Sequence, residues 1–150
     1  ERRPIIPFPI NVGRSFYLAP NPIFEQSISA YAEQHKLLRE LSEQSDCVIV
    51  GRCADYVLRD RNPFRIFIYA DQASKIKRCM ERKPAEEDLS QREMKKKMAE
   101  IDRNRSKYYE FFSEQKWGVR ANYDLLLNTT DKDIEKMASA VYAYVKEAFA

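Results

Sequence analysis

Three short apolar runs, which alternate along the chain with segments of helical periodicity, constrain its fold more than any other feature. The runs are residues 47–50, 65–70 and 123–128. They do not alternate apolar with polar residues, and such continuous runs are typical of parallel strands covered on both faces. Strands that alternate with helices predict an α/β fold with a mainly parallel sheet.

Local signals mark where the intervening helices begin. Asn21-Pro22 is typical of a helix start, because Asn caps the first turn and Pro fits within it. Asp71 is expected to cap a helix over residues 72–83, with Ala73 among the inward residues. Two later helix starts are predicted as well. Ser90 with Glu93 forms a capping-box pattern, and the last helix opens at Thr130 and Asp133.

Length and composition place the chain among ordinary globular proteins. It has 150 residues, of which 44% are hydrophobic and 33% charged, enough for one domain with a core. The net charge of +3 does not require a nucleic-acid or anionic-membrane partner, and no apolar run is long enough to cross a bilayer. Cys47, Cys53 and Cys79 show no C-x-x-C spacing. We therefore expect a cytoplasmic protein without disulfides or a zinc site.

The first 21 residues differ from the rest. The chain begins at Glu1 without Met, and five prolines fall within its first 22 residues. Because Pro disrupts both helices and central strands, residues 1–21 are expected to form an extended arm or a long loop. Residues 22–150 are expected to form the α/β domain, and the chain is expected to be part of a longer protein.

An arginine stands directly after the first apolar run. Ligands of open parallel sheets bind beyond the carboxyl ends of the strands. Gly51 lets the backbone leave the run sharply, and Arg52 then presents a planar, permanently charged guanidinium that suits phosphate. An ion pair of Arg52 with Asp55 or Asp60 on a surface turn explains the same residues equally well.

A second arginine, Arg105, lies on the apolar stripe of the helix that starts near Ser90. A charge at such a position must be paired, contact a ligand or lie beyond the packed part of the helix. Asp102 precedes it by three residues and is within reach. A structural Asp102–Arg105 ion pair is therefore the alternative to ligand binding.

A cluster of cations, KIKRCMERK at residues 75–83, precedes a loop rich in acids and then the next helix. This order predicts a flap between two helices whose cations close over phosphate. The alternative is an ordinary solvated helix end, where basic residues are favourable.

In combination, these stretches resemble the cytidylate kinase-like family of P-loop nucleoside monophosphate kinases. VIVGRCADYVLRD followed by FRIFIYA resembles the strand, Gly-Arg-x-x-Asp turn and next strand of that family. The similarity continues through KIKRCMERK and AEIDRNRSKYYEFFSEQKWGVRANYDLLLNTT, so that it covers residues 22–150. The resemblance implies a three-layer, parallel-sheet, P-loop kinase-like fold with a helical lid around residues 78–107.

The resemblance also implies an activity: ATP-dependent phosphoryl transfer to a nucleoside monophosphate such as CMP, with ATP and Mg²⁺ as cofactors. It implies that the acceptor is bound by Arg52, Asp55, Asp102, Arg103 and Arg105. It implies roles in catalysis at the transferring phosphates for Arg78 and Arg105, and contacts near the adenine of ATP for Asn128, Thr129 and Thr130. No side chain is expected to be a metal ligand. Arginine guanidinium groups suit phosphoryl transfer, because the protein catalyses it mainly by positioning the phosphates and neutralising their charge.

The sequence departs from the family at one point. Its three glycines, Gly13, Gly51 and Gly118, are too far apart to build a G-x-x-x-x-G-K-[ST] loop. In the family this P-loop follows the first strand, at the centre of the sheet, and that strand and the next are missing here. A sheet without its central strand exposes long edges. We therefore expect an upstream segment to supply the P-loop; the alternative is that it was lost together with kinase activity.

Two other functions fit the same residues. A kinase-fold regulatory domain would bind a nucleotide without turnover. A basic RNA-binding module is suggested by residues 95–97, Arg103 and Arg105 with their aromatic neighbours. The low net charge and the interleaved acids argue against the second function, and no nucleic-acid or membrane partner is expected.

Overall fold

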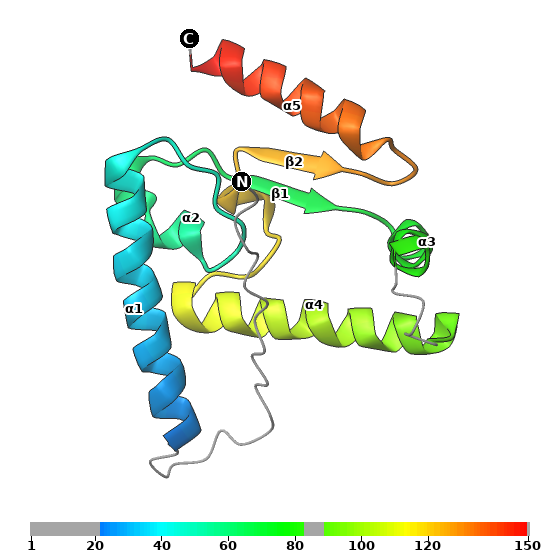
Figure 1. Cartoon of the computed structure of the whole chain (residues 1–150), viewed down its shortest axis with the longest axis horizontal. Coiled ribbons are helices and arrows are strands. Elements are labelled where there is room, and N and C mark those ends of the chain that lie inside the picture. Colours follow the sequence, from blue (N-terminus) through cyan, green and yellow to red (C-terminus); the bar gives the residue numbers. More distant parts are fainter. Residues whose placement is uncertain (1–21, 83–88, 150) are drawn as a thin grey trace. The chain divides into compact units, whose positions relative to one another are not determined.

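Helices and strands alternate along the chain. The computed structural model describes residues 22–82 and 89–149, with side chains from residue 29 onward. The helices, strands and 3₁₀ turns of that part (Figure 1) are α1 (Pro22–Gln44), α2 (Ala54–Val57), η1 (Arg59–Arg61), β1 (Ile66–Tyr69), α3 (Gln72–Arg82), α4 (Gln91–Ser113), η2 (Arg120–Asn122), β2 (Leu125–Asn128) and α5 (Ile134–Ala148). The predicted arm over residues 1–21 and the part of the predicted lid at residues 83–88 lie outside the described residues.

The starts of α3, α4 and α5 confirm the capping predictions made for them, whereas Asn21, the predicted cap of α1, lies outside the described residues. Asp71 Oδ1 accepts a hydrogen bond from Ser74 N at 2.7 Å at the start of α3. Ser90 N donates to Glu93 Oε2 at 2.9 Å, and Glu93 N donates to Ser90 Oγ at 3.3 Å, which completes the capping box of α4. Asp133 caps α5 by accepting from two main-chain N–H groups of its first turn. These bonds satisfy donors that a helix start leaves unmatched.

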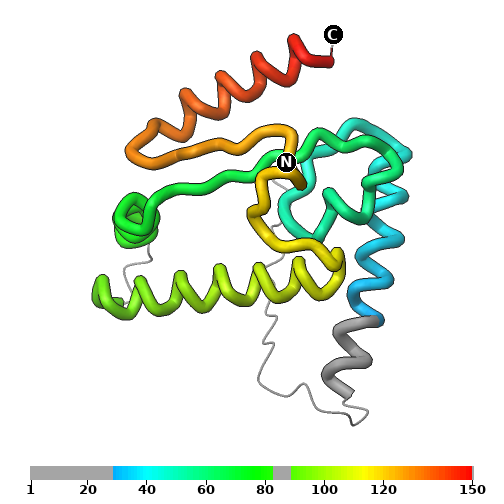
Figure 2. The backbone as a smooth tube through the Cα atoms, turned by 180° about the vertical axis from the view of Figure 1, so that it is seen from behind, coloured from blue at the N-terminus to red at the C-terminus, as the bar shows by residue number. Residues whose placement is uncertain are grey.

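β1 and β2 form a parallel pair, as the sequence predicts. Ile66 lies opposite Leu125, and Tyr69 lies opposite Asn128. The two segments run side by side in the views from the front and from behind (Figures 1 and 2). Both strands are shorter than the apolar runs that predicted them. With helices between the strands, the fold is mixed α/β.

Both strands begin at the same ion pair. Arg65 N and Nε donate to Asp124 Oδ2 at 2.7 and 3.0 Å, and Arg65 Nη2 donates to Asp124 Oδ1 at 2.9 Å. The carbonyl oxygen of Arg65 accepts from Asp124 N and Leu125 N in return. Side chain and main chain therefore fix the register of the pair together.

Residues 47–50 are not a strand, and that prediction was wrong. A strand persists only where a neighbour takes up its main-chain groups, and within the described part of the chain only β1 and β2 pair. Val48 is 96% and Val50 88% exposed, whereas Ile49 packs against buried residues. The segment thus passes over the surface with one apolar residue turned inward.

The chain divides into two compact units. Unit 1 comprises Glu1–Asn62 and Asn104–Gln115, and unit 2 comprises Pro63–Arg103 and Lys116–Ala150. The first part of α4 therefore belongs to unit 2 and its last part to unit 1. Among the described residues, no helix is both long enough and apolar enough to cross a membrane.

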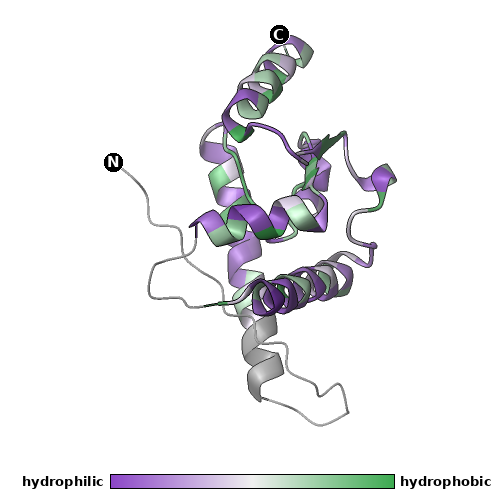
Figure 3. Cartoon of the chain, turned by 90° about the vertical axis from the view of Figure 1, so that its right-hand side faces the viewer, coloured by the Kyte–Doolittle hydropathy of each residue, from purple (hydrophilic) through white to green (hydrophobic). Residues whose placement is uncertain are grey.

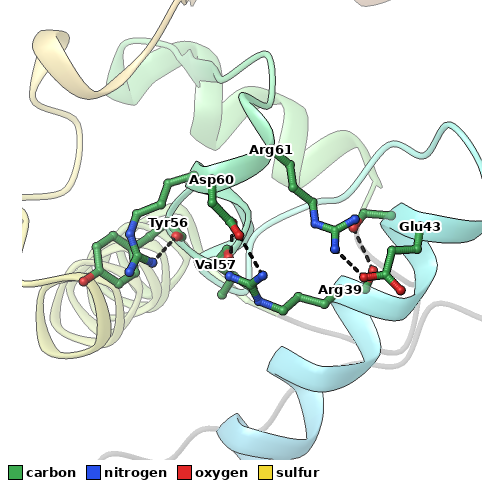
Figure 4. Close-up of polar contacts among 8 residues, drawn as sticks. Arg39, Glu43, Tyr56, Val57, Asp60 and Arg61 are labelled. Atoms are coloured by element: carbon green, nitrogen blue, oxygen red, sulfur yellow. Dashed lines mark hydrogen bonds and ion pairs between the residues drawn. The ribbon is translucent and has the colours of Figure 1, made fainter.

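In unit 1, α1 packs against α2 and the residues that follow it. Leu38 of α1 joins a buried cluster with Ala54, Val57 and Leu58. Arginines reinforce this contact (Figure 4). Arg39 donates to both carboxylate oxygens of Asp60, at 2.9 and 3.0 Å, and to the Val57 carbonyl at 3.0 Å. A second ion pair joins Arg61 to Glu43 of α1.

In unit 2, aromatic side chains gather around Phe67 of β1. The ring centroid of Phe67 lies 5.3 Å from that of Trp117 and 4.8 Å from that of Tyr123. Gly118 has φ 77°, and a Cβ placed there would lie 3.1 Å from the Phe67 ring. α5 carries hydrophobic and hydrophilic residues along its length (Figure 3), and none of its described residues is buried.

Candidate functional site

The turn that carries Arg52 has an unusual backbone. Gly51, Arg52 and Cys53 have φ values of 74°, 63° and 52°, all in the left-handed region. Glycine adopts this region freely, but each non-glycine residue there costs about 1–2 kcal/mol. Two such residues in succession persist only where the surroundings hold them, and strain of this kind concentrates at functional sites.

Backbone bonds and burial hold the turn. Ala54 N donates to Gly51 O at 3.1 Å, and Val57 N donates to Cys53 O at 2.8 Å. Cys53 and Ala54 are 3% and 8% exposed. Burial raises the pKa of the Cys53 thiol to about 12. This cysteine is therefore a packing residue at neutral pH and not a nucleophile.

The Arg52 side chain is half-buried between helices of unit 1. Its Nη1 donates to Gln34 Oε1 of α1 at 3.2 Å. Burial lowers the pKa of the guanidinium from its ordinary value, while the nearby Tyr108 phenol acts in the opposite direction. Because arginine titrates far above physiological pH, the group stays charged. A partly desolvated guanidinium interacts with an anion more strongly than one in water.

The two acids considered as partners of Arg52 have partners elsewhere. Asp60 is bound by Arg39, which lowers the pKa of the Asp60 carboxyl (Figure 4). Asp55 Oδ2 accepts a 2.7 Å hydrogen bond from the hydroxyl of Tyr109. Sequence reasoning missed Tyr109, because a residue 54 positions away gives no local signal of this contact.

Aromatic residues of α1 and α4 pack next to this turn. The Tyr31 and Phe112 rings stack with centroids 3.8 Å apart and planes at 13°. The ring centroid of Tyr108 lies 4.7 Å from that of Phe112. Burial raises the pKa of Tyr108 to about 12, so it is a neutral phenol at physiological pH. Unit 1 therefore brings Arg52 and Asp55 together with Tyr108 and Tyr109.

The three site residues predicted on the middle of α4 do not all belong to the unit that contains the Arg52 turn. Arg105 is exposed and belongs to unit 1, whereas Asp102 and Arg103 belong to unit 2. Asp102 Oδ2 accepts from Lys75 Nζ of α3 at 2.6 Å. Lys75 lies within the cation cluster of the sequence, but the sequence did not indicate its acid partner.

A second polar cluster lies at the carboxyl ends of β1 and β2, in unit 2. Arg78 Nη1 donates to the Thr129 carbonyl at 2.8 Å, and Arg78 Nη2 donates to Thr129 Oγ1 at 3.2 Å. Thr129 is 5% exposed, and both its N–H and its hydroxyl donate to Tyr69 O at the end of β1. The structure thus joins Arg78 to Thr129, two residues that the resemblance assigns to phosphate and adenine contacts.

The loop that follows β2 is bonded to the start of α3. Thr130 Oγ1 accepts from Asp71 N at 2.9 Å. Ser74 Oγ donates to Asp131 Oδ1 at 3.2 Å, and Asp131, at φ 50°, occupies the left-handed region. Ser74 is buried and Ala73 is exposed, so the prediction of Ala73 as an inward residue was wrong.

Asn128 acts inside the same loop, since its side-chain Oδ1 accepts from Thr130 N at 3.0 Å. Sequence reasoning missed Ser74 and Asp131 as members of this cluster. Within the described residues, no group of three or more His, Cys, Asp or Glu side chains is arranged to hold a metal ion.

The fold is mixed α/β, and each unit holds an arginine-containing polar cluster. The sequence model of the cytidylate kinase-like family matches residues 13–131, and the chain belongs to this family. A crystal structure of an uncharacterized protein from Eubacterium ventriosum ATCC 27560 is similar, with a TM-score of 0.70 and 30% sequence identity. The match covers 78% of this chain and 65% of that protein, so this chain spans less than two thirds of its length. No curated protein matches this chain.

Proposed function

We propose that this chain forms the acceptor-binding part of an ATP-dependent kinase that phosphorylates a nucleoside monophosphate. The observation that carries the proposal is the Arg52 turn. Its Gly-Arg-x-x-Asp sequence resembles a turn of the cytidylate kinase-like family, to which the chain belongs. It also holds a half-buried guanidinium on a strained backbone beside aromatic rings. A charge-assisted bond from such a group suits the phosphate of a nucleotide.

The remaining residues take the roles that the family implies. Arg78 and Arg105 are proposed to neutralise charge on the transferring phosphoryl group, which is what this reaction asks of a protein. Asp102, Arg103 and Arg105 are proposed to bind the acceptor. Asn128, Thr129 and Thr130 are proposed to lie near the adenine of ATP. ATP and Mg²⁺ are the proposed cofactors, and the cytoplasm is the proposed location of the protein.

A second candidate, nucleotide binding without turnover, is favoured by the glycine content. The three glycines of the sequence do not form a P-loop. If the protein is a kinase, the loop that binds the ATP phosphates must therefore be supplied by residues outside this 150-residue sequence. Turnover of ATP with a monophosphate acceptor separates the candidates, whereas acceptor binding is common to both.

Acceptor binding is therefore the property to test. Calorimetric titration with CMP, UMP, AMP and GMP is expected to show binding of at least one monophosphate. Arg52→Ala should weaken that binding at least tenfold, since a lost bond to a charged group costs about 1.5–3 kcal/mol and 1.4 kcal/mol is tenfold.

Arg59→Ala is the matched control. Arg59 also belongs to unit 1, but it is exposed and its guanidinium lies 4.1 Å over the Tyr56 ring. This variant should bind monophosphate like the parent chain. The proposal is wrong if no monophosphate binds, or if Arg52→Ala binds as tightly as the parent.

A further inference from the structure

The hydroxyl of Tyr109 reaches from α4 to the segment that carries Arg52. It donates to Asp55 Oδ2 at 2.7 Å, and Gln115 Oε1 lies 3.1 Å from the same hydroxyl. Tyr109 is only 6% exposed, so this bond is largely shielded from water. A short bond to a carboxylate in such surroundings is stronger than one between neutral groups.

Asp55 lies in the first turn of α2, two residues after Cys53, which is the last of the three residues with positive φ. A carboxylate fixed to α4 therefore fixes the start of α2, from which the strained turn leads back to Arg52. The Arg52 guanidinium is bonded in turn to Gln34 of α1. Two side-chain bonds, to two different helices, hold this short segment in place.

The chemistry of the donor also matters. A tyrosine hydroxyl is neutral, so it holds the Asp55 carboxylate without placing a second cation beside Arg52. A lysine or arginine in the same place would compete with Arg52 for an incoming anion. Phenylalanine would pack as well as tyrosine but would leave the carboxylate without this donor.

We propose that Tyr109 is a positioning residue, which holds Asp55 and thereby keeps Arg52 in the conformation that binds the phosphate of a nucleoside monophosphate. This inference rests on the proposed function, because it names the residue that sets the direction of the phosphate-binding group. It assigns Asp55 to the support of the turn and not to contact with the acceptor.

Conservative variants test the proposal by calorimetry with CMP, or with whichever of the other three monophosphates binds most tightly. Tyr109→Phe and Asp55→Ala should each weaken binding about tenfold. Asp55→Asn keeps an oxygen that accepts from Tyr109, although in a weaker bond without the charge, and should bind more tightly than Asp55→Ala. Tyr142→Phe, at a position 70% exposed, is the matched control and should have no effect. If Asp55→Asn binds as weakly as Asp55→Ala, the charge of Asp55 acts on the ligand and the inference is wrong.

A double-mutant cycle separates positioning from general damage to the fold. In an Arg52→Ala background, Tyr109→Phe should cause no further loss of affinity, because the group that it positions is gone. The same tenfold loss in both backgrounds would overturn the inference. Circular dichroism of each variant establishes that it is folded.

The inference and the proposed function fail in different ways. If Arg52→Ala leaves affinity unchanged, or if the parent binds no monophosphate, the proposed function fails. The positioning role of Tyr109 is then tested without ligand, by measuring the hydrogen-exchange rates of the backbone amides at residues 51–55. Exchange about tenfold faster in Tyr109→Phe supports the positioning role, and unchanged exchange overturns it. If Arg52→Ala loses affinity but Tyr109→Phe does not, only the inference fails.

Discussion

Two glycines are needed for their backbone conformation, but only one of them is also needed for its small size. Gly118 has φ 77°, and an added Cβ would lie 3.1 Å from the ring of Phe67. Gly51 has φ 74°, and an added Cβ would meet no atom within 4 Å. Alanine is therefore strained at both positions and crowded at Gly118 alone.

Gly118→Ala is expected to lower the free energy of unfolding by about 2–5 kcal/mol, the sum of left-handed strain and overpacking against Phe67. Gly51→Ala supplies the matched control, because it keeps the strain without the crowding and should cost about 1–2 kcal/mol. Urea denaturation followed by circular dichroism measures both values. Equal losses would show that the Phe67 ring yields to the added methyl group.

At the scale of single elements, the sequence predicted helices better than strands, for a physical reason. The caps of α3, α4 and α5 depend on residues within three positions of the helix start, so they can be read locally. A strand depends on a partner from elsewhere in the chain. The apolar runs that contain β1 and β2 pair with each other. Residues 47–50 have an equally strand-like composition but lie outside any strand.

The pairing of β1 with β2 is expected to weaken in acid through Asp124. The hydrogen bonds from Arg65 lower the pKa of the Asp124 carboxyl below its ordinary value of 3.8. The folded-state pKa is depressed, so this stabilisation is fully present above about pH 4 and is lost as the pH falls through the lowered value. Asp124→Asn should cost about 1 kcal/mol at pH 7, since the pair is about one-third exposed.

Thermal melts between pH 2.5 and 7 measure this effect. The difference in melting temperature between the parent and Asp124→Asn should shrink toward the acid end. Glu33→Gln, at an exposed position of α1, should leave the melting temperature unchanged and serves as control. A difference that is constant with pH would contradict a role for the Asp124 charge.

At the scale of the whole molecule, the chain has two sets of packed residues. Val57, fully buried, belongs to unit 1, and Phe67 with Trp117 belongs to unit 2. Contacts within a unit join distant parts of the chain, such as Tyr109 with Asp55 and Lys75 with Asp102. Composition and spacing contain no signal of such pairs. For this reason the sequence indicated Arg52 but missed the residues that hold its turn.

The two units are expected to unfold as separate cooperative steps. Val57→Ala should destabilise unit 1 by about 2 kcal/mol through the cavity that it leaves. Trp117 is the single tryptophan of the chain, so its fluorescence reports on unit 2. The urea midpoint measured by Trp117 fluorescence should therefore stay unchanged in Val57→Ala, while the transition measured by circular dichroism broadens or shifts.

The control variant is Phe67→Leu in unit 2, which should shift the midpoint measured by fluorescence. Identical shifts of both probes in Val57→Ala would mean that the chain unfolds as one unit.

The exposed segment at residues 47–50 has a consequence for the behaviour of the protein in concentrated solution. Val48 and Val50 present β-branched side chains to solvent, in a run without charge or proline. Such a run is a template for pairing between molecules, which leads to aggregation. Asp46 and Arg52 place one charge on each side of it, and flanking charges of this kind are expected to oppose the stacking of copies. Colloidal stability is therefore expected to depend on these two flanking charges more than on the small net charge of the chain.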